Sequence, residues 1–276
     1  MIYWIYDMPS WVFGILTVTL FVLLSCGGLW LTREPIRRNF RLTDDTNEAV
    51  NAYFSGVGVF YGLLLGLVAV ATWENFEDVS GLVSKEAAAL GALYRDVGAY
   101  PEPLRADLQS DLRAYTKFVI DEAWPAQQKG LILVGGTLIL DRFQNRMLAF
   151  EPKSQGQSVI HAEAFHAFNH LVEARRLRVD AVGTGLPAVL WSVVLIGAGL
   201  SIFVTYFLYI GDLRLHLIMT ATLAMFIGLM VFLTAVVDNP FRGDAAVSAD
   251  AYRLIMEGVM DKKLVIEAEP DPDEPR

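Results

Sequence analysis

The stretch AVNAYFSGVGVFYGLLLGLVAVATW, residues 49–73, decides the fold, because it contains no Asp, Glu, Lys or Arg. Three other stretches of similar length also lack these residues, at 8–32, 181–211 and 215–237. The apolar core of a bilayer is about 30 Å thick, and a helix of about 20 apolar residues crosses it. Each stretch is long enough, so the sequence predicts four transmembrane helices.

Composition supports a membrane protein. Hydrophobic residues make up 54% of the chain and charged residues 19%, with a mean hydropathy of +0.40, whereas an ordinary soluble domain is about 25% charged. The net charge of −9 argues against nucleic acid as a partner, because binding to phosphates requires basic patches. A single cysteine, Cys26, excludes intramolecular disulfides and cysteine-type metal sites.

The apolar stretches divide the chain into four parts and predict an all-α, polytopic membrane protein. Residues 8–73 form a first transmembrane hairpin, and residues 181–237 form a second one. Between them, residues 74–180 form a helical soluble insert. Residues 238–276 form a C-terminal segment, whose last ten residues, 267–276, are acidic and rich in proline and are predicted to be disordered.

The insert is predicted to be helical because its apolar residues recur at three-to-four spacing. Residues 73–79 contain neither Pro nor Gly, so we expect the second span to continue into the insert as one helix. The same continuity is expected at 175–182, which leads into the third span. Pro125 is expected to end a helix that begins near Pro103.

Small residues repeat along the second span at Ser55, Gly58, Gly62 and Gly66, which places them on one stripe of a helix. Such stripes permit close packing between helices in membranes. Alternatively, the stripe lines a pore around a symmetry axis. Four spans enclose little space alone, so a pore requires several copies of the chain.

Three carboxylates, Glu74, Glu77 and Asp78, follow directly on the second span at i, i+3 and i+4. In a symmetric ring they would form acidic rings at a pore mouth, which attract cations. The alternative is an ordinary solvated end of a helix.

Other sites are weakly indicated. His166 and His170 lie one turn apart, a spacing that can share a metal ion, but no third ligand is evident and an ordinary polar helix face is the alternative. No catalytic or nucleotide-binding motif is found, so we expect neither an enzyme nor a cofactor. No charged residue lies deep in a span, which argues against a pump.

Several short pieces in one order, together covering about residues 50–245, resemble the bacterial bestrophin-like domain family. These pieces are Tyr61–Val70, Trp73–Phe76, Glu86-Ala87, Leu93–Arg95, Tyr100-Pro101, Glu122–Pro125, Arg175-Arg176, Leu186-Pro187, Leu190-Trp191, His216 with Met219, and Asp238–Gly243.

The resemblance implies a homo-oligomeric, pentameric channel for inorganic ions in the bacterial inner membrane. It implies a pore lined by the second span, with the insert and both termini in the cytoplasm. Lys and Arg residues near the span ends are almost evenly divided and do not decide the orientation. Two hypotheses follow: an oligomeric ion channel with a preference for cations, or a non-conducting scaffold or sensor whose insert binds a partner.

Overall fold

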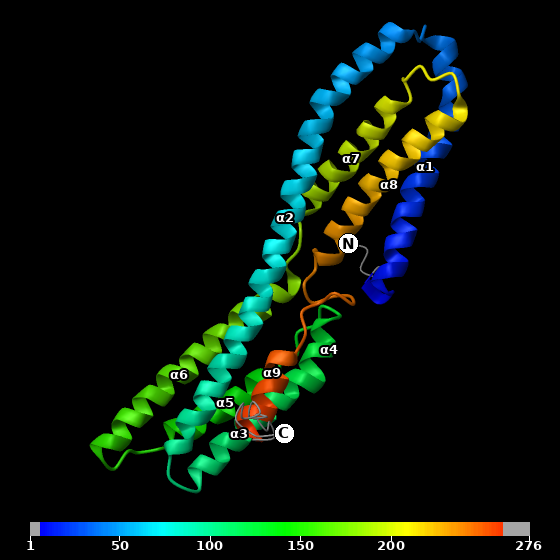
Figure 1. Ribbon diagram of the computed structural model, residues 1–276. Helices are drawn as coiled ribbons and strands as arrows, with labels where there is room; N and C mark the ends of the chain where they lie inside the picture. Colours follow the sequence, from blue (N-terminus) through cyan, green and yellow to red (C-terminus); the bar gives the residue numbers. More distant parts are fainter. Residues whose placement is uncertain (1–5, 262–276) are drawn as a thin grey trace, which may run out of the picture. The chain divides into compact units, whose positions relative to one another are not determined.

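The computed structural model describes residues 6–261, and throughout this part of the chain the regular structure is helical (Figure 1). Among these residues, four helices are long and apolar enough to cross a membrane, within Ser10–Asn39, Asp44–Ala99, Gln155–Thr205 and Leu213–Val237. The predicted all-α architecture with four spans is therefore confirmed.

The chain divides into two compact units. The first, here the membrane unit, comprises Met1–Asp78 and Thr184–Ala246; the second, the insert unit, comprises Val79–Gly183 and Val247–Arg276. After the last span, residues 238–246 are thus part of the membrane unit and residues 247–261 are part of the insert unit. The acidic segment 267–276, predicted to be disordered, lies outside the described residues.

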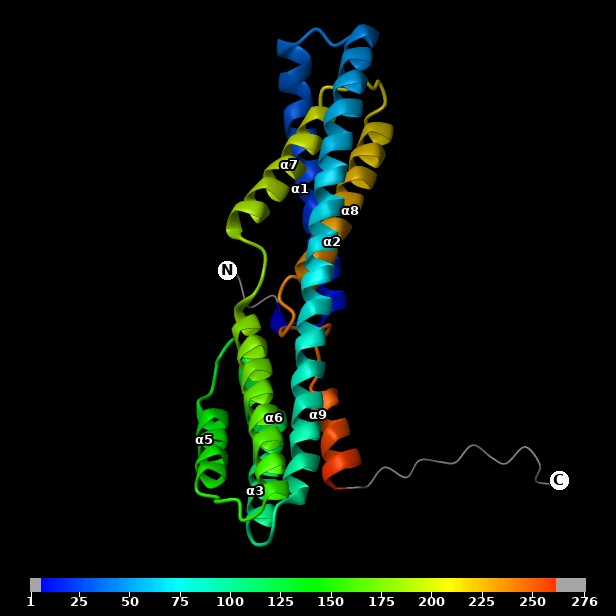
Figure 2. The same ribbon diagram turned by 90° about the vertical axis from the view of Figure 1, so that its left-hand side faces the viewer.

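The membrane unit contains helix α1 (Ser10–Asn39), the first part of α2 (Asp44–Asp96), α7 (Ala188–Thr205) and α8 (Leu213–Val237). Figures 1 and 2 both show α1 and α8 side by side. Only 11% to 33% of the most apolar window of each span is buried, so most of this surface requires lipid or another copy to cover it.

Glycines allow the membrane helices to approach closely. A methyl group on Gly228 of α8 would lie 3.2 Å from the Val18 Cα of α1, and one on Gly14 would lie 3.1 Å from the Phe232 ring. This is the small-residue packing that membrane helices favour. The apolar core around these contacts comprises Leu29, Ile36, Tyr61, Leu65, Val68, Leu186, Val194, Ala198, Ile202, Tyr206, Ala224, Ile227 and Val231.

Polar side chains hold the α7–α8 loop. Arg33 donates to the carbonyls of Ile210 and Gly211, both at 3.0 Å, and Arg37 also donates to Ile210 at 3.0 Å. Asn47 of α2 accepts from the Tyr209 backbone N–H at 2.6 Å and donates to its carbonyl at 3.1 Å. Loop carbonyls that would otherwise lack partners are therefore satisfied.

Asp238, just after α8, is hydrogen-bonded to residues at the start of α7. Its carboxylate accepts from the Leu186 backbone N–H at 2.5 Å, from Trp191 Nε1 at 3.1 Å and from the Asn239 amide at 3.3 Å. Burial raises the pKa of Asp238, and the hydrogen bonds from Leu186 and Trp191 oppose that rise. The carboxylate thus joins the end of one span to the beginning of another.

The insert unit contains the last turns of α2 together with three longer α-helices and two short ones (Figure 2). These are α3 (Leu104–Phe118), α4 (Trp124–Gln127), α5 (Gly135–Leu148), α6 (Gln155–Asp180) and α9 (Asp250–Ile255).

Charged and aromatic side chains form a buried cluster in this unit. Arg178 donates to Glu86, and both side chains are at most 1% exposed. Arg178 also donates to Gln127 at 2.6 Å, while Tyr115 donates to Glu86 at 2.5 Å. The Arg178 guanidinium lies 5.7 Å from the Trp124 ring centroid and 5.8 Å from the Tyr252 ring centroid. Both distances are within cation–π range. Burial raises the pKa of Tyr115, so the hydroxyl remains a donor.

Two expectations about continuity have different outcomes. Helix α2 runs unbroken from Asp44 to Asp96, so the expected continuation of the second span is confirmed. The expected continuation into the third span is wrong, because α6 ends at Asp180 and α7 begins at Ala188. Pro187 precedes α7 and disfavours a helical backbone at the residue before it.

The expectation that Pro125 ends a helix is also wrong. A π-helical turn, Val119–Ala123, follows α3, and Pro125 then falls in the first turn of α4. A proline is tolerated there because the first N–H groups of a helix have no partner within it. The turn after α4 contains Gly130 at a φ of 74°, a conformation that glycine adopts without strain.

Candidate functional site

Helix α2 contacts α7 at Tyr61, which belongs to a stripe of buried residues on α2. Tyr61, Leu65, Val68 and Thr72 recur at spacings of four, three and four, and each is at most 9% exposed. The Tyr61 hydroxyl donates to the Val194 carbonyl of α7 at 3.0 Å. A methyl group on Gly197 would lie 2.5 Å from the Tyr61 ring, so only glycine permits this approach.

The predicted small-residue stripe lies on a different face of α2. A methyl group on Gly62 or Gly66 would meet nothing within 4 Å, and one on Gly58 would meet only Phe54 of the same helix. Ser55 is exposed and donates to the carbonyl of Asn51 at 2.8 Å. Within residues 6–261 the stripe therefore does not pack against another helix of the same chain. Packing between copies and pore lining remain the two interpretations.

Bulky residues occupy a third face of α2. Phe60 is 76% exposed and Leu67 is 69% exposed. At about 3.6 residues per turn, both lie about 140–160° around the helix from Gly62. The helix thus has a buried stripe, a stripe of small residues and an apolar exposed face, and this last face requires lipid or another copy to cover it.

The three predicted carboxylates, Glu74, Glu77 and Asp78, are all exposed on α2. None of them has an ion-pair or hydrogen-bond partner among residues 6–261. Within the described part of the chain, no basic side chain is therefore paired with them.

The weak metal candidates, His166 and His170, are exposed on α6. In the part of the chain that the structure describes, no three His, Cys, Asp or Glu side chains come together as a metal site would require. A different histidine, His161, is half-buried and hydrogen-bonded through Nδ1 to the Tyr100 hydroxyl at 2.7 Å.

The burial of the His216 side chain differs from what its position in the sequence indicates. Its place at the start of the fourth span predicts a polar cap at the membrane surface, but the side chain is 2% exposed. Its Nε2 faces the Thr205 carbonyl at 2.9 Å. The partner lies on α7, eleven residues earlier, so periodicity within one helix could not reveal it.

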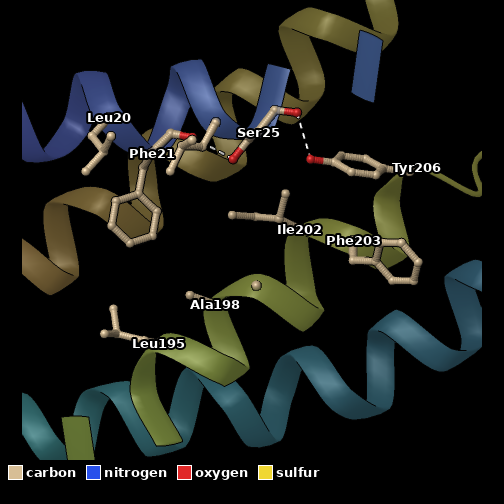
Figure 3. A pocket seen from close by; sticks show the side chains of 10 residues that line it. Leu20, Phe21, Ser25, Leu195, Ala198, Ile202, Phe203 and Tyr206 are labelled. Carbon is tan, nitrogen blue, oxygen red and sulfur yellow. Dashed lines mark hydrogen bonds between the residues drawn. The ribbon is translucent and has the colours of Figure 1, made fainter. Parts of the chain in front are cut away.

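A cavity of about 410 Å³ lies between α1 and α7 (Figure 3). Its polar groups are satisfied, because Ser25 Oγ donates to the Phe21 carbonyl at 2.6 Å and Tyr206 donates to the Ser25 carbonyl at 2.8 Å. The remaining lining side chains are apolar: Leu20, Leu24, Leu195, Ala198, Ile202 and Phe203. The cavity offers apolar contact and no free polar group to orient a ligand.

Several solved structures have a similar fold, and some of them are of a bacterial bestrophin homologue. A variant of a bacterial bestrophin homologue from Klebsiella pneumoniae gives a TM-score of 0.65 at 18% identity, covering 90% of this chain and 99% of that chain. A second structure of that homologue gives 0.62 at 19% identity, covering 90% and 97%. A crystal structure described only as a membrane protein gives 0.67 at 15% identity, covering 90% and 97%.

These TM-scores show a shared fold. Comparison with curated proteins finds no significant match. The model of the bestrophin-like domain, in contrast, matches residues 19–252. That match includes all of α2, α7 and α8 and most of α1. The chain belongs to the bestrophin-like family.

Proposed function

We propose that the protein is an ion channel in which several copies of the chain surround a path lined by α2. The observation that carries this proposal is the stripe of small residues at Gly58, Gly62 and Gly66, which contacts no other helix of the described chain. Family membership supports a channel, and the similar solved structures include those of a bacterial bestrophin homologue. Small residues leave room for ions along the axis of such a ring.

Assembly follows from the other faces of α2 in this proposal. Its buried stripe is hydrogen-bonded to α7 through Tyr61 within the chain, while Phe60 and Leu67 offer exposed apolar surface that a neighbouring copy can cover. The resemblance of the sequence to the family points to five copies. It also points to the bacterial inner membrane, with the insert and both termini in the cytoplasm.

Cation preference is the second part of the proposal. Glu74, Glu77 and Asp78 directly follow the apolar part of α2, are exposed, and have no neutralising partner among residues 6–261. Repeated around a ring, they would concentrate inorganic cations at one end of the path.

The test is the current across a planar bilayer that contains the purified protein, under a tenfold KCl gradient. We expect a protein-dependent current whose reversal potential has the sign of a cation-selective path, with a limit of about 59 mV for perfect selectivity. Replacing Glu74 and Glu77 by Gln should shift the reversal potential towards zero, because it removes two negative charges per copy.

The matched control removes two exposed carboxylates elsewhere, at Glu163 and Glu173 of α6, and should leave the reversal potential unchanged. An equal reversal potential in the wild type and the Glu74→Gln, Glu77→Gln variant would contradict the cation site. A protein that is silent at all voltages, pH values and calcium concentrations would instead favour a non-conducting scaffold.

A further inference from the structure

A second cavity in the membrane unit, of about 210 Å³, lies between α2, α7 and α8. By the same measure a single water requires about 10–15 Å³, and a dry cavity of about 150 Å³ holds benzene. The space therefore suits a molecule slightly larger than benzene. The lining includes Phe54, Leu208, His216, Met219, Thr220 and Leu223.

Thr220 brings an unsatisfied hydroxyl to this cavity. The residue is 1% exposed, and its Oγ1 has no hydrogen-bond partner. Other threonines of α8 bond to the carbonyl four residues earlier: Thr222 to Ile218 at 2.8 Å and Thr234 to Met230 at 3.0 Å. Leaving a buried hydroxyl unpaired is unfavourable, so a partner from outside the described chain is indicated.

His216, which lines the same cavity, supplies an acceptor. Its Nε2 faces the Thr205 carbonyl at 2.9 Å, and a carbonyl can only accept, so Nε2 carries the proton. In the neutral ring Nδ1 is then a bare acceptor, and it has no hydrogen-bond partner among residues 6–261. His216 and Thr220 are four residues apart, hence on one face of α8.

The charge and shape of the cavity restrict the ligand. No Asp, Glu, Lys or Arg is among its lining residues, so a charged ligand would lose its hydration without a counter-ion. A hydroxyl group can donate to His216 Nδ1 and accept from Thr220 Oγ1, and it satisfies both groups together. The side chains of Phe54, Leu208, Met219 and Leu223 can cover an apolar body.

We propose that this cavity binds a small neutral molecule that carries one hydroxyl group on an apolar body, of the size of phenol. An alkyl or lipid chain would fill the space but leave Thr220 and His216 unpaired. Water would satisfy the polar pair but would contact the apolar wall unfavourably.

The test uses 4-fluorophenol as the probe and ¹⁹F NMR as the readout, with the full-length purified protein in detergent micelles. Thr220→Val keeps the shape of the side chain and removes only the hydroxyl. Thr222→Val is the matched control, because Thr222 lies on the same helix, is exposed and is not among the lining residues. A second probe, 4-fluoroanisole, has the same ring but cannot donate a hydrogen bond.

We expect saturable binding of 4-fluorophenol to the wild type and to Thr222→Val. Affinity should fall about threefold to tenfold in Thr220→Val, the range for loss of one hydrogen bond, and 4-fluoroanisole should bind the wild type more weakly. Thr220→Val should not lower the apparent Tm, because it removes an unsatisfied buried group.

The proposal is overturned if the wild type shows no saturable binding, which would mean that only water fills the cavity. It is also overturned if Thr220→Val binds 4-fluorophenol as tightly as the wild type, or if 4-fluoroanisole binds equally well, since either result indicates simple apolar partitioning. Binding is measured without a current, so this result is independent of the proposed channel function.

Discussion

Replacing Arg178 by Met should lower the apparent Tm of the protein by about 10 °C. The change removes the counter-ion of Glu86, which is 0% exposed. The Glu86 carboxylate then stays buried without a neutralising charge, although Tyr115 still donates to it. Breaking a buried ion pair in this way lowers the free energy of unfolding by about 3–5 kcal/mol. For a domain of the size of the insert unit, this loss lowers the apparent Tm by about 10 °C.

The control is Arg176→Met, two residues earlier on the same helix. Arg176 is 83% exposed and faces Asp180 at 3.9 Å, and an exposed pair of this kind contributes less than about 1 kcal/mol. Thermal unfolding, followed by circular dichroism, measures both variants. Adding Glu86→Gln to Arg178→Met should recover much of the lost stability, because the unpaired charge is then gone. If Arg178→Met and Arg176→Met unfold at the same temperature, the buried cluster does not stabilise the insert unit.

Replacing Gly62 by Leu should reduce the current about tenfold or more while leaving the chain folded. The position has space for a side chain, because a methyl group there would meet nothing within 4 Å. In a ring of copies the added leucines would form a hydrophobic constriction, which resists the passage of ions. Bilayer current per assembled complex is the measurement, with size-exclusion chromatography to show that assembly is intact.

Gly197→Leu is the contrasting variant. Its side chain would collide with the Tyr61 ring, since even a methyl group would lie 2.5 Å away, so we expect misfolding rather than a folded, blocked protein. A folded and assembled Gly62→Leu protein with the full wild-type current would place the stripe away from the ion path. Loss of assembly in that variant would instead favour packing between copies.

The sequence predicts the helical architecture and the four spans because both depend on local patterns. Runs without charge predict the membrane helices, and the absence of Pro and Gly in residues 73–79 correctly predicts that α2 is continuous. Contacts between residues that are far apart in the sequence cannot be predicted from local patterns. Glu86 and Arg178 are 92 residues apart, and no spacing rule connects them.

A weaker signal for the buried pair was nevertheless present. Glu86 lies between Val83 and Leu90, on the apolar face of its helix, and a charge on such a face requires a partner. The cavity beside Thr220 carries no comparable signal, because a threonine in an apolar helix normally bonds to its own backbone. Only the positions of α2, α7 and α8 in space show that this hydroxyl is unpaired.

The accessibility of Gly62 to a water-soluble thiol reagent tests the central claim, that the small-residue stripe of α2 lines the ion path. Gly62→Cys is prepared in a Cys26→Ser background, which removes the single native thiol. Phe226→Cys, at a position of α8 that is 63% exposed, serves as the control. We predict that the reagent stops most of the current through Gly62→Cys and leaves Phe226→Cys and the Cys26→Ser parent unchanged. An undiminished current through fully labelled Gly62→Cys would contradict the claim.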